Sequence, residues 1–528
     1  MTFFVLILSL SLFISIRGFT VQPFKKKFSL KRLKSISNND LNIAESSKKE
    51  NSIDVDSNLA FTTMLGIPLA TNLLIPYLLT EVTNFNKSPQ ERQWFILALL
   101  LSKRVAIYSF AGSCLDYCAK RSMNVKFGLG QRLLDINNEI FGVFGKTYTE
   151  QITTDFQESY EALDELDGTT QAIALPILLG GFLLTSFLPI VLSSQLNNGM
   201  NGMNNNMNID LTLVKEILLN IQPVLLNFSA ISGAIVCILF ARIELKSVLS
   251  TAPFQIQNII NNDDDNNNTD DIHDSKVIDI LAIITSIALI GACEVSPNGG
   301  WGWPLQNYAN SFVAVAVARA ASLPRLPWII LALIGLAAYD VTAVNTQVLT
   351  DGGASIMEAV ARAKAGMDGV GTTADSSVDA VKAASTYAVT TANWRPWIPG
   401  LFEISVGGKA SDLLGVGDVV FPAILAGWSR RFDADYSETN TNTNTNTNTN
   451  TNEEIDLKST GLYTASILGF SIGCLACELF QTGSGQPALI FLVPSMLTTV
   501  GIQGARQGVL QEMWNYGNNE NDLNIKED

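Results

Sequence analysis

The sequence predicts an all-α, polytopic membrane protein, and three observations carry that prediction. Of the 528 residues, 47% are apolar and only 16% are charged, whereas soluble domains contain about 25% charged residues. The mean hydropathy is +0.23. About ten apolar segments approach the roughly 20 residues that a helix needs to cross a bilayer.

These segments are separated by polar stretches with too few apolar residues to form a core. The expected spans are 59–80, 94–116, 171–195, 217–241, 277–294, 308–323, 327–347, 412–428, 460–480 and 486–505. The polar stretches 197–208, 261–274 and 439–452 are expected to be disordered loops. Segment 94–116 is the weakest span, because Lys103 and Arg104 lie at its middle. A charge there costs about 2.5–3.5 kcal/mol, so two shorter interfacial helices are the alternative.

The N-terminus has the features of a targeting sequence. Residues 3–16 are apolar but too short to span, so 1–18 is predicted to be a signal peptide. The basic segment 19–50, which begins with Phe19, resembles the presequence that directs proteins to plastids of secondary origin. A plain secretory signal with a basic mature N-terminus is the alternative. Both stay open, so the expected location is a membrane derived from the endoplasmic reticulum or an algal plastid membrane.

Several function classes are excluded by composition. The single histidine, His273, lies in an acidic, Asn-rich loop, which excludes a Ser–His intramembrane protease and an H-E-x-x-H metalloprotease. No basic face indicates a nucleic-acid partner. Cys474 and Cys477 lie one helical turn apart in an apolar segment, where packing is favoured over redox or metal chemistry. No metal and no cofactor are expected.

The basic residues predict the topology. They follow alternate spans, and the short connections 295–307 and 481–485 contain no Lys or Arg. By the positive-inside rule, the side that holds them is the cytosol or its equivalent. The residues concerned are Arg242, Lys246, Arg325, Arg430, Arg431 and Arg506.

Two aspartates, Asp340 and Asp418, lie within consecutive apolar segments that this topology makes antiparallel. A carboxylate at membrane depth is costly, so such residues usually face a water-filled cavity and have a function. Two neighbouring carboxyl groups cannot both ionise, and they can therefore act as general base and general acid. Tyr339 offers a hydroxyl beside Asp340. Gly415 and Gly417 allow a backbone or a helix to approach Asp418 closely.

Three short motifs follow one another in separate apolar segments. They are Tyr339-Asp340, then Gly415-Val416-Gly417-Asp418, then Gln486-Pro487-Ala488-Leu489. This set resembles the YD, GxGD and PAL motifs of the presenilin and signal peptide peptidase family, and the flanking residues resemble the signal peptide peptidase-like branch. The resemblance covers about residues 277–515, whereas the first half matches only in being hydrophobic.

The resemblance implies about nine transmembrane helices, with the catalytic aspartates on the adjacent sixth and seventh. It implies an intramembrane-cleaving aspartic endopeptidase with Asp340 and Asp418 as catalytic residues and Tyr339, Gly415, Gly417, Gln486, Pro487, Ala488 and Leu489 positioning the substrate. The domains are then the N-terminal membrane region 59–275, the catalytic membrane region 276–515 and a polar tail 516–528. Pro487 is expected to keep the backbone at Gln486 unwound, and a simple helix start is the alternative.

Residues 400–409 alternate well enough to form a strand that pairs with an extended substrate. The connection 351–400 has Ala-rich amphipathic stretches, and its role stays open. The expected partners are single-span substrates and the lipid bilayer, and a homo-oligomer is left open. The competing functions are a catalytically idle homologue that binds membrane helices and an Asp-dependent transporter.

Overall fold

The structure is a computed structural model that describes only part of the chain. The described residues are 38–83, 88–122, 129–141, 170, 173, 234–235, 237–250, 270–295, 302–345, 400–406, 409–444, 460–480 and 487–517. The elements are α2 (Asn38–Thr83), α3 (Pro89–Arg121), α4 (Leu129–Phe141), α9 (Asp270–Val295), α10 (Gly302–Ala320), α11 (Leu326–Asn345), β1 (Leu401–Val406), β2 (Lys409–Gly415), α14 (Gly417–Asn444), α15 (Leu462–Leu479), α16 (Leu489–Gln507) and α17 (Leu510–Asn515).

The chain is largely helical and membrane-spanning, as the composition predicts. Within the described residues, four helices are long and apolar enough to cross a bilayer: Ser57–Thr83, Pro89–Arg121, Leu462–Leu479 and Leu489–Gln507. Two shorter apolar helices are Val277–Cys293 and Leu326–Thr342. Segment 171–195 apart from residue 173, and most of 217–241, lie outside the described residues, as do 1–37 and 346–399.

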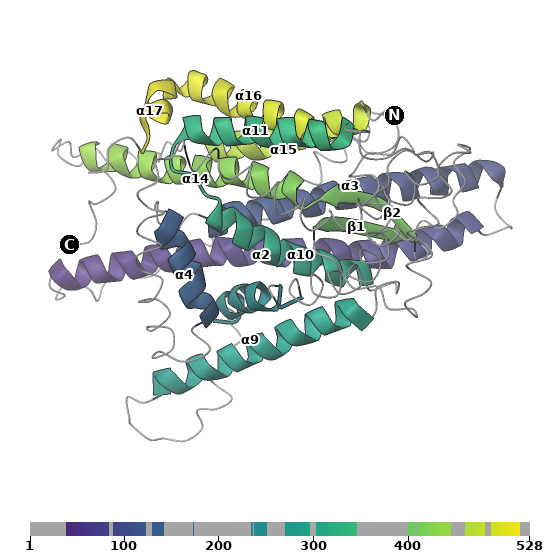
Figure 1. Cartoon of the computed structure of the whole chain (residues 1–528), viewed down its shortest axis with the longest axis horizontal. Coiled ribbons are helices and arrows are strands. Elements are labelled where there is room, and N and C mark those ends of the chain that lie inside the picture. Colours follow the sequence, from purple (N-terminus) through teal and green to yellow (C-terminus); the bar gives the residue numbers. More distant parts are fainter. Residues whose placement is uncertain are drawn as a thin grey trace, which may run out of the picture.

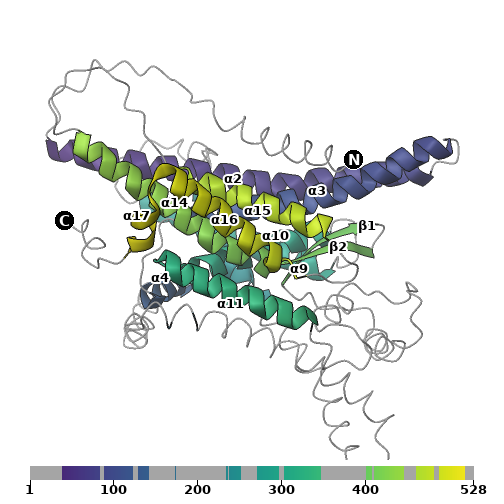
Figure 2. The same ribbon diagram turned by 90° about the horizontal axis from the view of Figure 1, so that it is seen from above.

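Helix α14 is the centre of the arrangement. It contacts α3, α10, α11, α15 and α16, and its Trp428 and Phe432 stack within the main core. Figure 1 shows α11, α14, α15 and α16 on one side of the long α2–α3 pair and α9 on the other. The α2–α3 pair extends past the β-hairpin at one end (Figure 2). Because α14 carries Asp418 on its first turn, this packing fixes one end of the candidate site.

Segment 94–116 belongs to one continuous helix, α3, so the alternative of two shorter interfacial helices is wrong. Ser88 and Glu91 form a reciprocal capping box, and Pro89 occupies the first helical position, where a missing N–H costs nothing. The charge of Arg104 is compensated by an ion pair with Glu478 at the end of α15, at 3.2 Å. The Tyr108 hydroxyl donates to the same carboxylate at 3.3 Å. Charged side chains within membrane segments are usually paired with one another.

Three sequence-derived boundaries are corrected. Helix α2 begins at Asn38, inside the basic segment 19–50, and α9 begins at Asp270, inside the expected loop 261–274. Helix α14 continues to Asn444, into the expected loop 439–452. Adding a residue to an existing helix needs no new nucleus, so polar flanks can continue a helix that apolar packing has started.

The all-α prediction also lacks one element, an antiparallel hairpin of β1 and β2. The strand expected at 400–409 is confirmed as β1. The span expected at 412–428 begins later, because residues up to Gly415 belong to β2 and α14 starts at Gly417. Glycines at 415 and 417 disfavour helix on entropic grounds. The Val416 N–H donates to the Gly400 carbonyl at 3.0 Å, which closes the hairpin just before α14.

The basic connection between α10 and α11 packs against the middle of α14 and against the C-terminal segment. Arg325 donates to the Gly517 carbonyl at 2.9 Å, and Arg431 donates to the Leu323 carbonyl at 3.0 Å. The Trp428 indole N–H donates to the Pro324 carbonyl at 3.0 Å. Two of the basic residues used for the topology, Arg325 and Arg431, therefore both lie at this connection, and the topology itself stays a prediction.

Candidate active site

Asp340 lies near the end of α11, the most apolar of the helices that surround it. The helix packs against α14 and α16, and its Ile329, Leu333 and Leu336 are fully buried. This packing leaves Asp340 half-buried on the side of α11 that carries it toward α16. Its Oδ2 accepts a hydrogen bond from the Leu489 backbone N–H at 3.1 Å.

Asp418 is the second residue of α14, and it is also half-buried. Its Oδ2 accepts a hydrogen bond from the Gly415 N–H at 3.1 Å. The first turn of the helix is anchored on Val416, whose carbonyl accepts from the N–H groups of Val419 at 3.1 Å and Val420 at 3.0 Å. A carboxylate at a helix N-terminus is stabilised by the helix dipole, so this position suits a side chain that must ionise in an apolar setting.

A side chain at either of the two glycines before Asp418 would crowd the side chains of the site itself. A Cβ on Gly415 would lie 3.0 Å from Asp418 Oδ2, and a Cβ on Gly417 would lie 3.1 Å from the Phe421 ring. From the sequence, both glycines are predicted to allow a substrate or a helix to approach closely. The structure adds a local explanation for Gly415, because a side chain there would push against the Asp418 carboxylate.

The third motif reaches the site through its backbone. Leu489 is the first residue of α16, and the first N–H groups of a helix have no partner within the helix. One of these N–H groups is the donor to Asp340. Ala488 and Leu489 are buried, and Pro487 precedes them outside the helix. Gln486 lies outside the described residues.

Tyr339 is placed differently from the sequence-derived expectation. Its side chain is 36% exposed on α11, and in the described part of the chain no hydrogen bond joins its hydroxyl to either aspartate. Its orienting role stays a prediction.

The two aspartates lie on helices that pack against each other, Asp340 on α11 and Asp418 on α14. Each accepts one backbone N–H on a single oxygen. Among the described residues this is the donor that fixes each carboxylate, and the second oxygen is left available to a water molecule or a substrate carbonyl. No group of three or more His, Cys, Asp or Glu side chains suited to a metal ion occurs among the described residues.

A small-residue motif that was not predicted from the sequence sets the distance between α15 and α16. Gly469 and Gly473 form a G-x-x-x-G on α15, and both face α16. A Cβ on Gly469 would lie 2.6 Å from the Met496 Cα, and one on Gly473 would lie 2.8 Å from the Leu492 Cα. Such spacing lets two membrane helices approach closely. The motif was readable from the sequence, because G-x-x-x-G in an apolar helix predicts this kind of contact.

We expect Gly473→Ala to lower both stability and activity, because the added methyl must push α16 away from α15. Overpacking of this kind costs about 1–3 kcal/mol in free energy of unfolding. Displacement of α16 also moves the Leu489 N–H away from Asp340. Thermal unfolding in detergent micelles and a cleavage assay measure the two effects. Gly501→Ala on α16 is the control, since nothing lies within 4 Å of its Cβ position. Equal behaviour of the two variants would contradict the packing argument.

The fold and the site define a class: a helical membrane protein with two aspartates on helices that pack against each other. The sequence model of the signal peptide peptidase family matches residues 159–520, more than half of the chain. The chain therefore belongs to the signal peptide peptidase family, which is a family of intramembrane aspartic proteases. The match begins well before residue 277, so the similarity to the family extends further toward the N-terminus than the expected range of about 277–515.

Individual relatives are distant. Signal peptide peptidase-like 3 from Oryza sativa subsp. japonica is 33% identical over 106 residues, 20% of this chain and 17% of the relative. Signal peptide peptidase-like 2A from Mus musculus is 25% identical over 242 residues, 45% of this chain and 39% of the relative. Signal peptide peptidase-like 2B from Homo sapiens is 27% identical over 205 residues, 38% of this chain and 28% of the relative. The matches span less than two fifths of these relatives' lengths. No solved structure matches the chain.

Proposed function

We propose that this chain hydrolyses peptide bonds within transmembrane segments, with Asp340 and Asp418 as the catalytic pair. The observation that carries the proposal is the backbone support of both carboxylates. The Leu489 N–H, from the third motif, donates to Asp340, and the Gly415 N–H, from the second, donates to Asp418. The first and third motifs thus meet at Asp340, and α11, which carries Asp340, packs against α14, which carries Asp418.

The proposed mechanism uses one shared proton. Two adjacent carboxyl groups avoid simultaneous ionisation, so one is ionised and one is protonated at neutral pH. The ionised group takes a proton from water as the water attacks the scissile carbonyl. The protonated group donates its proton to the carbonyl oxygen. The group that took the proton from water then gives it to the leaving amine, and the other carboxylate takes back the hydroxyl proton of the tetrahedral intermediate as the C–N bond breaks. No step requires a metal or a cofactor.

The β-hairpin supplies a surface for an extended substrate. Strand β2 ends at Gly415, next to Asp418, and within the described residues the sheet has only the two strands β1 and β2. A substrate strand can therefore add to the sheet by β-augmentation. Such pairing requires the scissile segment to be unwound from its helix. The proposed substrates are single-span proteins of type II orientation or signal-peptide remnants, with the basic ends of this chain facing the cytosol.

The remaining assignments are also proposals. They are a signal peptide at 1–18, a basic targeting segment at 19–50, membrane regions at 59–275 and 276–515, and about nine spans in total. The location is a membrane derived from the endoplasmic reticulum or a plastid membrane. Fluorescent fusions that end at Gly18 and at Lys49 test it, because retention of the longer fusion in the endoplasmic reticulum would exclude the plastid.

The direct test of the proposed function is a cleavage assay. The purified full-length chain is incubated in detergent with a labelled single-span peptide, with and without a transition-state analogue of aspartic proteases. We expect cleavage that the analogue blocks and that chelators do not affect. An intact peptide, with the analogue still bound, would support the idle homologue instead. Loss of cleavage with a chelator and its return with zinc would contradict the aspartic mechanism.

A further inference from the structure

Helix α10 presents two buried asparagines to strand β1. Asn307 and Asn310 lie one turn apart and are 1% and 0% exposed. Asn307 donates from Nδ2 to the Glu403 carbonyl at 2.8 Å and accepts on Oδ1 from the Glu403 N–H at 2.8 Å. Asn310 donates to the Leu401 carbonyl at 2.6 Å and accepts from the Gly400 N–H at 3.1 Å. Four hydrogen bonds thus join the amides to the strand backbone.

These amides occupy one edge of β1 in the way that a neighbouring strand would. In an antiparallel pair, alternate residues direct both backbone groups to the same edge. The N–H and the carbonyl of Glu403 bond Asn307 and therefore point away from β2. In the register with β2, Glu403 lies opposite Leu413 as a non-hydrogen-bonded pair. With α10 on its outer edge, β1 cannot accept a further strand at these residues. Within the described part of the chain no strand pairs with the outer edge of β2, so this edge is the one that an incoming strand can use.

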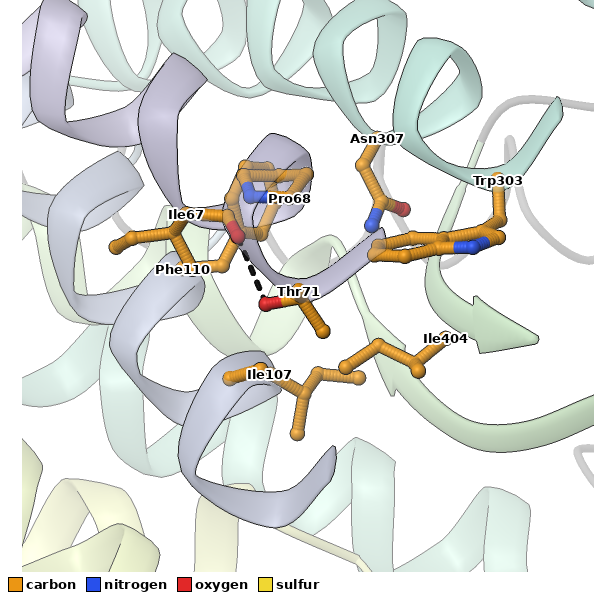
Figure 3. Close-up of a pocket in the computed structure, with 9 residues that line it drawn as sticks. Ile67, Pro68, Thr71, Ile107, Phe110, Trp303, Asn307 and Ile404 are labelled. Carbon is orange, nitrogen blue, oxygen red and sulfur yellow. Dashed lines mark hydrogen bonds between the residues drawn. The ribbon is translucent and has the colours of Figure 1, made fainter. Parts of the chain in front are cut away.

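The side chains of β1 dock the hairpin on the helices as well. Phe402 is fully buried and makes an edge-to-face contact with Phe110 of α3, with ring centroids 5.2 Å apart. Figure 3 shows Ile404 facing Ile107 of α3 and Trp303 of α10, with Asn307 above them. Apolar packing alone does not fix the register of a strand against a helix, but hydrogen bonds to specific backbone groups do.

We propose that Asn307 and Asn310 are positioning residues that hold the hairpin formed before substrate arrives and direct substrate to the edge of β2. The proposal rests on the proposed function for its substrate half only. A hairpin that is already ordered removes an ordering cost from substrate binding. It also keeps Gly415, the last residue of β2 and the donor to Asp418, in place.

The first test uses the unmodified chain. Hydrogen–deuterium exchange is measured on the full-length protein in detergent, without substrate and with an active-site-directed analogue. We expect the backbone amides in 400–406, and those in 409–415 that face β1, to be protected in both states. Fast exchange without the analogue and protection only with it would show that substrate forms the hairpin, and would overturn the proposal. This measurement requires no catalytic activity, so it stands apart from the fate of the proposed function.

The second test removes the amides. Asn307→Ala and Asn310→Ala are compared with Ser311→Ala, because Ser311 is buried on the same helix but its hydroxyl bonds only the Asn307 carbonyl. We expect exchange in the hairpin to speed up at least about tenfold in the asparagine variants and not in the control. If one tenth of the molecules then hold a formed hairpin, the apparent KM rises about tenfold. The value of kcat at saturating substrate changes far less.

The outcomes separate positioning from a merely structural role. A structural role lowers yield and Tm and speeds exchange throughout the chain, including α15 and α16. Positioning speeds exchange in the hairpin alone and raises KM. Unchanged hairpin exchange in both asparagine variants would overturn the proposal. Faster hairpin exchange with an unchanged KM would overturn its substrate half.

Discussion

Asp340→Asn and Asp418→Asn are each expected to abolish peptide cleavage while leaving the protein folded. Asparagine has the shape of aspartate and keeps a side-chain oxygen, so it can still accept from the Leu489 N–H or the Gly415 N–H. It cannot take up or release the proton that the mechanism requires. General acid–base catalysis contributes about 10²–10⁴-fold, and the two groups share one proton cycle. We expect turnover to fall at least about 10³-fold in either variant.

The measurement is the cleavage of a labelled single-span peptide, together with Tm and membrane yield. Asp435→Asn is the matched control, because Asp435 lies on the same helix as Asp418 but 17 residues further on. At 1.5 Å per residue that is about 26 Å away. Its carboxylate accepts from the Tyr516 hydroxyl at 2.5 Å, and an asparagine can still do so. If either dyad variant kept more than about a tenth of wild-type turnover, the catalytic pair would be wrongly assigned.

These variants also separate the competing functions. A transporter that uses the same pair would lose transport but would have no peptide hydrolysis to lose. An idle homologue would show no cleavage before the substitution, and its affinity for a membrane helix would change little. Only a protease loses peptide cleavage on these substitutions while the protein stays folded.

Motifs that are local in sequence were the most predictable part of this site. The apolar segments around Asp340 and Asp418 and the alternation in 400–409 are properties of consecutive residues. The sequence therefore located α11, the first part of α14 and β1. It misplaced the start of α14, because Leu413 and Leu414 in β2 are as apolar as the helix that follows. Hydropathy does not distinguish a buried strand from the first turn of a span.

Contacts between distant residues were not predictable in this way. Arg104 was an anomaly in the sequence because its partner, Glu478, lies on another helix far along the chain. No role was predicted for Asn307 and Asn310, because two polar residues in an apolar helix do not indicate which backbone groups they bond. The Leu489 N–H is a backbone group, and a sequence carries no sign of its bond to Asp340. Each of these contacts depends on how helices pack, which periodicity alone does not determine.

Pro487→Ala is expected to cause a severe loss of cleavage without a loss of stability. Helix α16 begins at Leu489, and proline two residues earlier cannot donate a hydrogen bond and disfavours helix in the residue before it. Alanine favours helix over proline by about 3 kcal/mol in a helix interior, so the substitution allows α16 to extend toward Gln486. In an extended helix, the Leu489 N–H bonds to the carbonyl four residues earlier. That N–H is then no longer available as a donor to Asp340.

The expected result is a fall in kcat of at least about 10²-fold, the order of loss that a misplacement of about 1 Å can cause. Tm should be unchanged or higher, and labelling by an active-site-directed analogue should weaken. Pro487→Gly is the matched control, because it also restores the N–H and removes the ring but disfavours helix by about 1 kcal/mol relative to alanine. If helix extension is the cause, the glycine variant retains more activity than the alanine variant. Wild-type turnover in Pro487→Ala would leave Pro487 as a simple helix start, and equal losses in both variants would assign its role to the ring itself.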